Sequence, residues 1–155
     1  MPDAGRNRRH AIVRGLDIPR PFDLAVFAAG LEARRGRAIR LRPFSPGPGV
    51  PCGLWIAAAD TDYVYYEQAT TPFHVTVIVL HEIAHMLLDH RGPSAWENLA
   101  RQVAPDVHPS LVQLILSRSA YSTPEERDAE TLASRILERA TDWPARGSGF
   151  RVLVD

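Results

Sequence analysis

The chain has 155 residues, of which 45% are hydrophobic and 23% charged, as expected for one globular domain with its own core. Lys and Arg total 18 and Asp and Glu total 18, so the formal net charge is zero, which argues against broad attraction to nucleic acid or a membrane surface. A single cysteine, Cys52, excludes an internal disulfide and favours a reducing compartment. Without a signal-peptide pattern or an apolar run of roughly 18 residues, we expect a cytoplasmic protein.

The first half of the chain predicts one helix and three strands after a flexible start. Residues 1–21 are Arg-rich and bounded by Pro, which predicts a loose N-terminal arm. Residues 22–35 carry apolar side chains at helical spacing and predict a helix. Residues 38–44 alternate apolar and charged side chains, as a half-buried strand does. Residues 53–58 and 63–67 favour β structure and predict two more strands joined by a hairpin.

The second half is predicted to be helical. The apolar run 73–88 contains no Gly or Pro and predicts a long buried helix that ends near His90. Further helices are predicted at 94–103, 109–118 and 124–140, followed by a C-terminal tail at 143–155. The order indicates the α+β class, with a small antiparallel sheet packed on a helical bundle within one domain, residues 22–142.

The long helix contains the motif His81-Glu82-Ile83-Ala84-His85. Residues four apart share a helix face, so His81 and His85 project side by side and can both bind one Zn²⁺. Glu82 lies about 100° further round the helix, where it can accept a proton from a water held by the same ion. The alternative is a structural histidine pair, which would need other hydrogen-bond partners once buried.

A catalytic zinc site takes a third protein ligand and keeps one position open. Glu126 and Glu130 both border the apolar stripe of the helix at 124–140, and Glu126 is the preferred ligand. The competing interpretation places Glu126 in a capping box with the backbone N–H of Thr123. Asp89 falls on the side of His85, where it is a candidate acceptor for an imidazole N–H.

Three side chains are candidate donors to an oxyanion: Tyr121, His108 and His90. His90 is a poor candidate ligand, because in a continuing helix it points about 140° away from His85. An extended substrate could pair with the edge of the strand at 53–58 or at 63–67.

Two blocks of this sequence resemble the ImmA/IrrE family of zinc metallopeptidases. The first is His-Glu-Ile-Ala-His-Met-Leu-Leu-Asp-His, residues 81–90, and the second runs from Glu126 to Leu137. The family shows an H-E-I-G-H-x-x-L-x-H-like block followed by an E-x-E-A-N-x-F-A-x-x-L-L-like block. The second match is looser, because Asp128, Glu130 and Leu132 replace Glu, Asn and Phe. The resemblance implies that Glu126 is the third ligand and that Glu130 supports a ligand histidine.

The same resemblance implies a function. Such proteins are bacterial and cytosolic, and are implicated in cleaving helix-turn-helix transcriptional regulators in stress-response or mobile-element systems. This chain shows no helix-turn-helix of its own, so the regulator would supply DNA binding. The alternative is a non-proteolytic zinc-containing module that binds or senses through such a regulator, using the Arg clusters and Tyr63, Tyr65 and Tyr66 as its contact surface. A purely structural zinc site is disfavoured, because such sites are usually rich in Cys.

Overall fold

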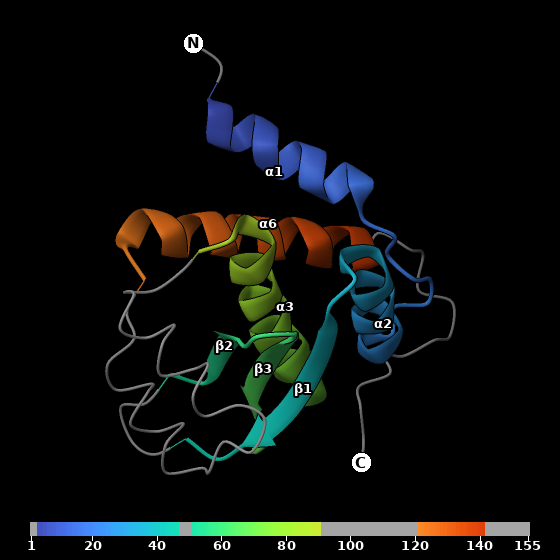
Figure 1. Cartoon of the computed structure of the whole chain (residues 1–155), viewed down its shortest axis with the longest axis vertical. Coiled ribbons are helices and arrows are strands. Elements are labelled where there is room, and N and C mark those ends of the chain that lie inside the picture. Colours follow the sequence, from blue (N-terminus) through green and yellow to red (C-terminus); the bar gives the residue numbers. More distant parts are fainter. Residues whose placement is uncertain (1–2, 47–50, 91–120, 142–155) are drawn as a thin grey trace.

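The computed structural model describes residues 3–46, 51–90 and 121–141 (Figure 1). Its elements in chain order are α1 (Ala4–Gly15), α2 (Leu24–Arg35), β1 (Ala38–Phe44), β2 (Gly53–Ala57), β3 (Thr61–Glu67), α3 (Pro72–Leu88) and α6 (Thr123–Thr141). These helices and strands confirm the predicted α+β class. The predicted helices at 94–103 and 109–118, the tail at 143–155 and the side chain of His108 lie outside the described residues.

The three strands form one mixed sheet in the order β1-β3-β2. β2 and β3 are antiparallel and joined by the predicted hairpin, in which the Ala58 N–H donates to the carbonyl oxygen of Thr61. β1, however, runs parallel to β3, so the prediction of an antiparallel sheet is wrong for this strand. Side-chain alternation marks a strand but carries no information about its neighbour's direction. β3 is the central strand, so within the described sheet only β1 and β2 keep an outer edge.

The long helix α3 packs between the sheet and α6 (Figure 1). Thr71 caps its first turn by accepting from the backbone N–H of His74, and Pro72 occupies the first turn, where no N–H is needed. The helix ends at Leu88 because Asp89 adopts a left-handed conformation, with φ of 55°. Its buried residues Leu80, Ile83 and Ala84 share one core with Leu132 and Ile136 of α6.

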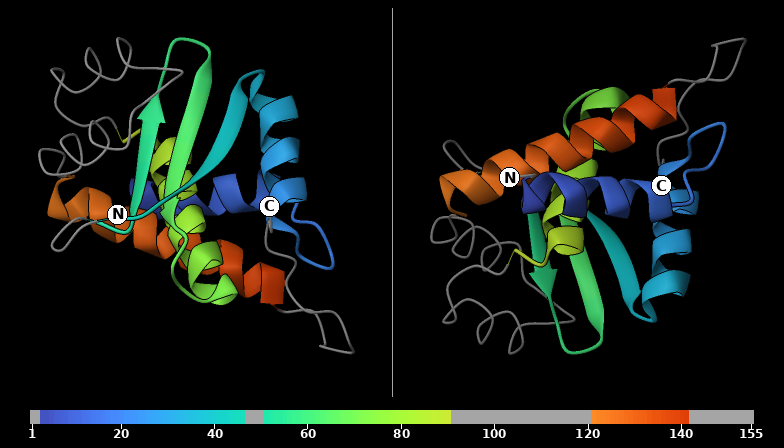
Figure 2. Two further views of the ribbon diagram at one scale, coloured as in Figure 1. Left: turned by 90° about the horizontal axis from the view of Figure 1, so that it is seen from below. Right: turned by 90° about the horizontal axis from the view of Figure 1, so that it is seen from above.

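The predicted loose arm instead contains helix α1, which lies alongside α6 (Figure 2). Val13 is buried in the common core, and the Arg9 guanidinium pairs with the Asp128 carboxylate of α6. The Arg8 Nη2 donates to the carbonyl oxygen of Leu88, at the C-terminus of α3, over 3.3 Å. Arg8 and Arg9 therefore bind the two central helices. Such contacts between distant segments leave no local pattern in the sequence.

Another group of arginines surrounds the fully buried carboxylate of Asp62. Its Oδ2 accepts from Arg35 Nη2 at 3.1 Å and from Arg37 Nε at 3.2 Å, and its Oδ1 accepts from Trp55 Nε1 at 3.0 Å. Arg37 also donates to the backbone carbonyl oxygens at the β2–β3 turn. The cluster therefore joins the end of α2 to the hairpin, and these arginines have a structural role.

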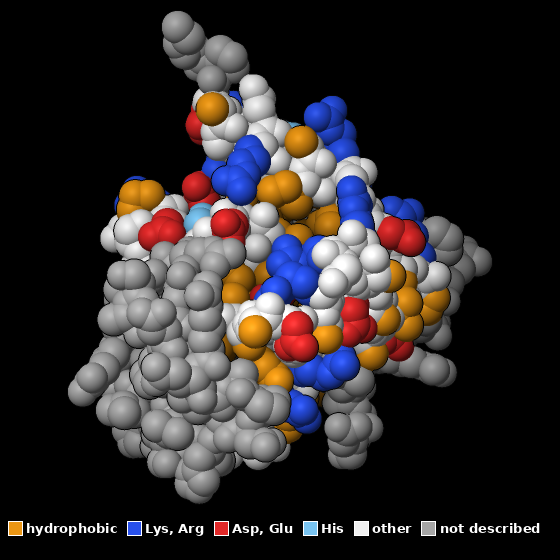
Figure 3. Space-filling model, in the orientation of Figure 1, with side chains coloured by type: hydrophobic (Ala, Val, Ile, Leu, Met, Phe, Trp, Pro, Cys, Tyr) orange, Lys and Arg blue, Asp and Glu red, His pale blue; other side chains and the backbone are white. Residues whose placement is uncertain are grey.

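Figure 3 shows acidic and basic side chains intermingled on this face of the described chain. Tyr63, Tyr65 and Tyr66, proposed as a contact surface for a binding module, are only 5–8% exposed, so that part of the interpretation is wrong. Among the described helices, none is both long enough and apolar enough to cross a membrane.

Replacing Asp62 with Ala should destabilise the fold by about 3 kcal/mol, because the change leaves Arg35 and Arg37 without their shared counter-charge. This is at the lower end for a broken buried ion pair, since both guanidinium groups can still turn toward water. Urea unfolding followed by circular dichroism measures the change. Asp60→Ala, at an exposed position two residues away, is the control and should cost less than about 1 kcal/mol. Equal effects of the two changes would contradict the structural role of Asp62.

Candidate metal centre

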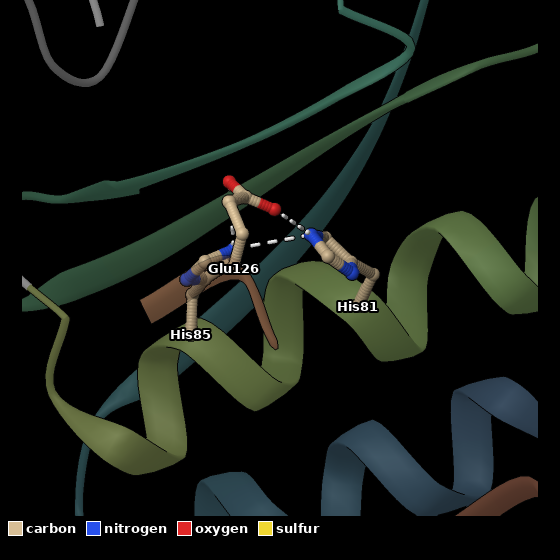
Figure 4. Close-up of side chains that lie close together, drawn as sticks. All are labelled: His81, His85 and Glu126. Carbon is tan, nitrogen blue, oxygen red and sulfur yellow. Dashed lines mark hydrogen bonds and ion pairs between the residues drawn. The ribbon is translucent and has the colours of Figure 1, made fainter. Parts of the chain in front are cut away.

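Three side chains from two helices converge at one point (Figure 4). His81 and His85 lie one turn apart on α3, and Glu126 lies in the first turn of α6. The Nε2 atoms of His81 and His85 are 3.1 Å apart. Glu126 Oε2 is 3.1 Å from His81 Nε2, and Glu126 Oε1 is 3.5 Å from His85 Nε2. Among the described residues, these three form a group that could hold a metal ion.

The spacing of the donor atoms fits a zinc-sized ion. Ligand atoms bound tetrahedrally to Zn²⁺ at roughly 2.0–2.1 Å lie about 3.3 Å from one another. Here the two Nε2 atoms are 3.1 Å apart and approach different oxygens of Glu126, at 3.1 and 3.5 Å, and one ligand atom from each residue lies within 4.8 Å of the others. Two imidazole nitrogens and one carboxylate are also a donor set that suits zinc. The residues present therefore fit the predicted ion, although several divalent transition metals share this preference.

Glu126 is free to face the histidines because its neighbour does the capping. Glu125 Oε1 accepts from the backbone N–H of Ser122, and Ser122 Oγ accepts from the backbone N–H of Glu125. This reciprocal pair is a capping box placed one residue earlier than the Thr123–Glu126 box considered from the sequence, which is therefore wrong. The carboxylate that follows a capping glutamate turns about 100° round the helix, toward α3.

His85 is fully buried and lies beside the rings of His81, His90 and Tyr121. The ring of Tyr121 stacks on it with a centroid distance of 3.8 Å and an interplanar angle of 13°. Burial, with smaller contributions from His81 and His90, lowers the pKa of His85 to about 3. The imidazole is therefore neutral near pH 7, which is the form that binds a metal.

His90 occupies a different place from the one predicted. Its Nδ1 lies 3.0 Å from the Nδ1 of His85, within hydrogen-bond distance. The prediction assumed a continuing helix, but the left-handed turn at Asp89 returns the chain toward His85. If His85 Nδ1 carries the proton, His90 accepts it and leaves Nε2 of His85 with a free lone pair directed at Glu126 and His81. His90 is thus placed to orient a ligand rather than to act as one.

Glu82 lies beside the three ligands, between α3 and β2. It is 6% exposed, and its Oε2 is buried with no hydrogen-bond partner among the described residues. Burial, and secondarily the charge of Glu126, raises the pKa of Glu82 to about 8, while the backbone N–H of Trp55 acts in the opposite direction. A nearby cation would favour the ionised carboxylate. The unpartnered oxygen is a second observation that fits a cation and a water at this point.

Gly53, at the start of β2, is a site residue that the sequence reasoning missed. A Cβ at this position would lie 2.7 Å from Ile78 Cγ2 and 2.8 Å from Glu82 Oε1. Only glycine therefore lets β2 approach α3 this closely. A glycine inside a predicted strand is a recognised signal of close backbone approach, and it was available in the sequence.

The remaining candidates are dispersed. Glu130 is exposed, lies outside the group of three and lines a cavity that His81 also lines, so Glu126 is the better-placed carboxylate. Asp89 is exposed at the end of α3 and lines a separate cavity with Arg35 and Arg37. The acceptor roles predicted for Glu130 and Asp89 remain predictions.

Comparison with known proteins adds no relative. No family model, no curated protein and no solved structure matched the chain.

Gly53→Ala should destabilise the fold by about 1–3 kcal/mol, because the added methyl group must displace Ile78 or Glu82. Thermal unfolding measures the change. The control is Gly30→Ala on α2, where an added Cβ meets no atom within 4 Å. This substitution should stabilise the fold by about 0.5–1 kcal/mol. A neutral or stabilising effect at Gly53 would show that β2 does not lie as close to Glu82 as described.

Glu126→Ala should weaken zinc binding by more than about 100-fold, because loss of a ligand exceeds the cost of losing a supporting residue. Competition with a fluorescent zinc chelator measures the affinity. Glu125→Ala is the matched control: it removes the adjacent carboxylate and its capping bonds, so it should lower stability by about 1 kcal/mol and leave zinc affinity nearly unchanged. If both variants bind zinc like the unmodified protein, Glu126 is not a ligand.

Proposed function

We propose that this protein is a zinc-dependent endopeptidase. The observation that carries the proposal is the triangle of donor atoms from His81, His85 and Glu126 with the buried carboxylate of Glu82 beside it. A structural site would close the metal with four protein ligands, often cysteines. Here the described residues offer three ligands and one adjacent base, which is the composition expected of a hydrolytic site.

The protein's own residues would divide the reaction as follows. Bound by the three ligands, Zn²⁺ supplies Lewis acidity, which makes water more acidic and a carbonyl more electrophilic. Glu82 accepts a proton from the attacking water while the water oxygen bonds to the peptide carbonyl carbon. Glu82 then returns that proton to the nitrogen as the C–N bond breaks, so that a carboxylic acid and an amine leave. Trp55 and Gly53 hold Glu82 in place through the backbone N–H and the close approach of β2.

Tyr121 is the better placed of the two described candidates for donation to the developing oxyanion. Its ring lies on His85, and burial raises the pKa of its hydroxyl, which therefore keeps its proton. His90 is already engaged with His85. The role of His108 stays a prediction from the sequence.

The outer edge of β2 is the better strand for aligning a substrate. β3 is excluded because it is paired on both sides. β2 pairs with β3 alone among the described strands, and it lies against Glu82 at Gly53. An extended peptide added to this edge would pass the site with its backbone hydrogen-bonded to the protein.

The cellular substrate follows from resemblance alone. The similarity of residues 81–90 and 126–137 to the ImmA/IrrE family supports a helix-turn-helix transcriptional regulator as the target, within a bacterial regulatory or mobile-element system and in the cytoplasm. Direct contact with nucleic acid is not part of the proposal, because the formal net charge is zero and several arginines are held in ion pairs.

Glu82→Gln should keep one zinc per chain and reduce cleavage by at least about 100-fold, since the variant loses the proton acceptor but none of the ligands. The assay exposes the zinc-loaded protein to a library of random decapeptides and to helix-turn-helix regulators from the same genome, with fragments identified by mass spectrometry. Removal of zinc with a chelator and its readdition to the unmodified protein serve as the control.

Two results would overturn the proposal. Undiminished cleavage by zinc-loaded Glu82→Gln protein would remove Glu82 as the base. Tight binding of a regulator without fragments from any zinc-loaded sample would favour the non-proteolytic module.

A further inference from the structure

A cavity of about 190 Å³ lies between α3 and α6, next to the candidate metal centre. Its apolar walls come from Val77 and Leu80 on α3 and from Ala133 and Leu137 on α6. Sites for whole small-molecule ligands usually measure roughly 300–1,000 Å³. This cavity is smaller, and its size suits a single side chain.

The cavity borders the candidate metal centre, because His81 is part of its lining. Val77 lies one helical turn before His81 on α3, and Glu130 lies one turn after Glu126 on α6. The cavity therefore begins about one helical turn from the candidate ligands on both helices. A residue of a peptide held at the metal would have its side chain within reach of the cavity.

The polar lining of the cavity carries a negative charge. Glu130 and Ser134, both exposed, complete the side formed by α6. The Glu130 carboxylate makes no hydrogen bond or ion pair with any other residue in the described part of the chain. Its predicted role as support for a ligand histidine would need such a bond. A carboxylate on the rim of an apolar cavity, with no partner among the described residues, is instead suited to a cation.

We propose that the cavity between α3 and α6 binds the side chain of a Lys or Arg residue of the substrate, with Glu130 as the counter-charge. This proposal rests on the proposed peptidase function, because only a peptidase would have a peptide substrate. The preference of the cavity for a basic side chain can be tested separately. Lys and Arg lay their methylene stems along apolar surface while the charged group stays near water. Val77, Leu80 and Leu137 would contact the stem, and Glu130 the cation at the open side.

Competing occupants fit less well. An acidic side chain would meet the charge of Glu130, with Glu126 one helical turn away. A purely apolar side chain would fill the walls but would offer no counter-charge to Glu130. The assignment to basic residues thus follows from apolar walls and one exposed carboxylate together.

The test uses blocked hexapeptides in which one position at a time is Lys, norleucine or Glu, since norleucine keeps the Lys stem and lacks the ammonium group. Binding to zinc-loaded Glu82→Gln protein, which we expect not to cleave them, is followed by fluorescence anisotropy. At one position Lys should bind about threefold to fivefold tighter than norleucine, as expected for a solvent-accessible charge pair, and Glu should bind weakest. The advantage of Lys should shrink at high salt.

Second substitutions made in the Glu82→Gln protein connect this preference to the cavity. Glu130→Gln should abolish the advantage of Lys over norleucine, and Glu130→Arg should transfer the preference to Glu. Glu138→Gln, a matched exposed carboxylate two turns further along α6 and outside the cavity lining, should change nothing. Ser134→Leu should fill the cavity and weaken Lys and norleucine peptides alike. Melting curves check that each variant is folded.

The outcomes separate this inference from the peptidase proposal. If Lys has no advantage at any position, or if its advantage survives Glu130→Gln, the cavity assignment is wrong even where the unmodified protein cleaves peptides. If the Lys preference follows Glu130 but the unmodified zinc-loaded protein produces no fragments, the cavity assignment stands and the peptidase proposal fails.

Discussion

The packing of α6 across α3 is the contact on which the rest of the site depends. Burial of Leu80, Ile83 and Ala84 against Leu132 and Ile136 fixes the two helices relative to each other. Both histidines come from one helix, so their spacing is a local property, but the carboxylate must be delivered by the other. Apolar packing between α3 and α6 thus sets the distances among three polar atoms, and close-packed interiors hold such distances to a fraction of an ångström.

That packing is reinforced from the side opposite the sheet. Helix α1 binds α6 through Arg9 and Asp128, and it binds the end of α3 through Arg8 and the Leu88 carbonyl. These contacts join the two helices that carry His81, His85 and Glu126. A segment that was predicted to be a loose arm therefore stabilises the geometry of the candidate metal centre, although it contributes none of the three candidate ligands.

The sequence predicted much of the site because the relevant signals are local. The i, i+4 spacing of His81 and His85, an apolar run without Gly or Pro and the amphipathic pattern of α6 each depend on residues within a few turns of one another. The face argument placed both Glu126 and Glu130 at the border of the apolar stripe, with Glu126 preferred, and the structure places Glu126 with the histidines. The competing interpretation of Glu126 as a capping residue was wrong, because the capping box is formed one position earlier, by Ser122 and Glu125.

The sequence by itself determined helices α2, α3 and α6, the three strands, the α+β class and the histidine pair, because periodicity and turn residues act between near neighbours. Only the tertiary structure decided that β1 runs parallel to β3 and that the Arg-rich N-terminal segment forms a helix packed on α6. It also decided that β2 approaches Glu82 closely at Gly53. It also returned His90 to the side of His85 through the left-handed turn at Asp89. Each of these depends on which distant surfaces meet, and that choice is made by burial and charge pairing across the whole chain.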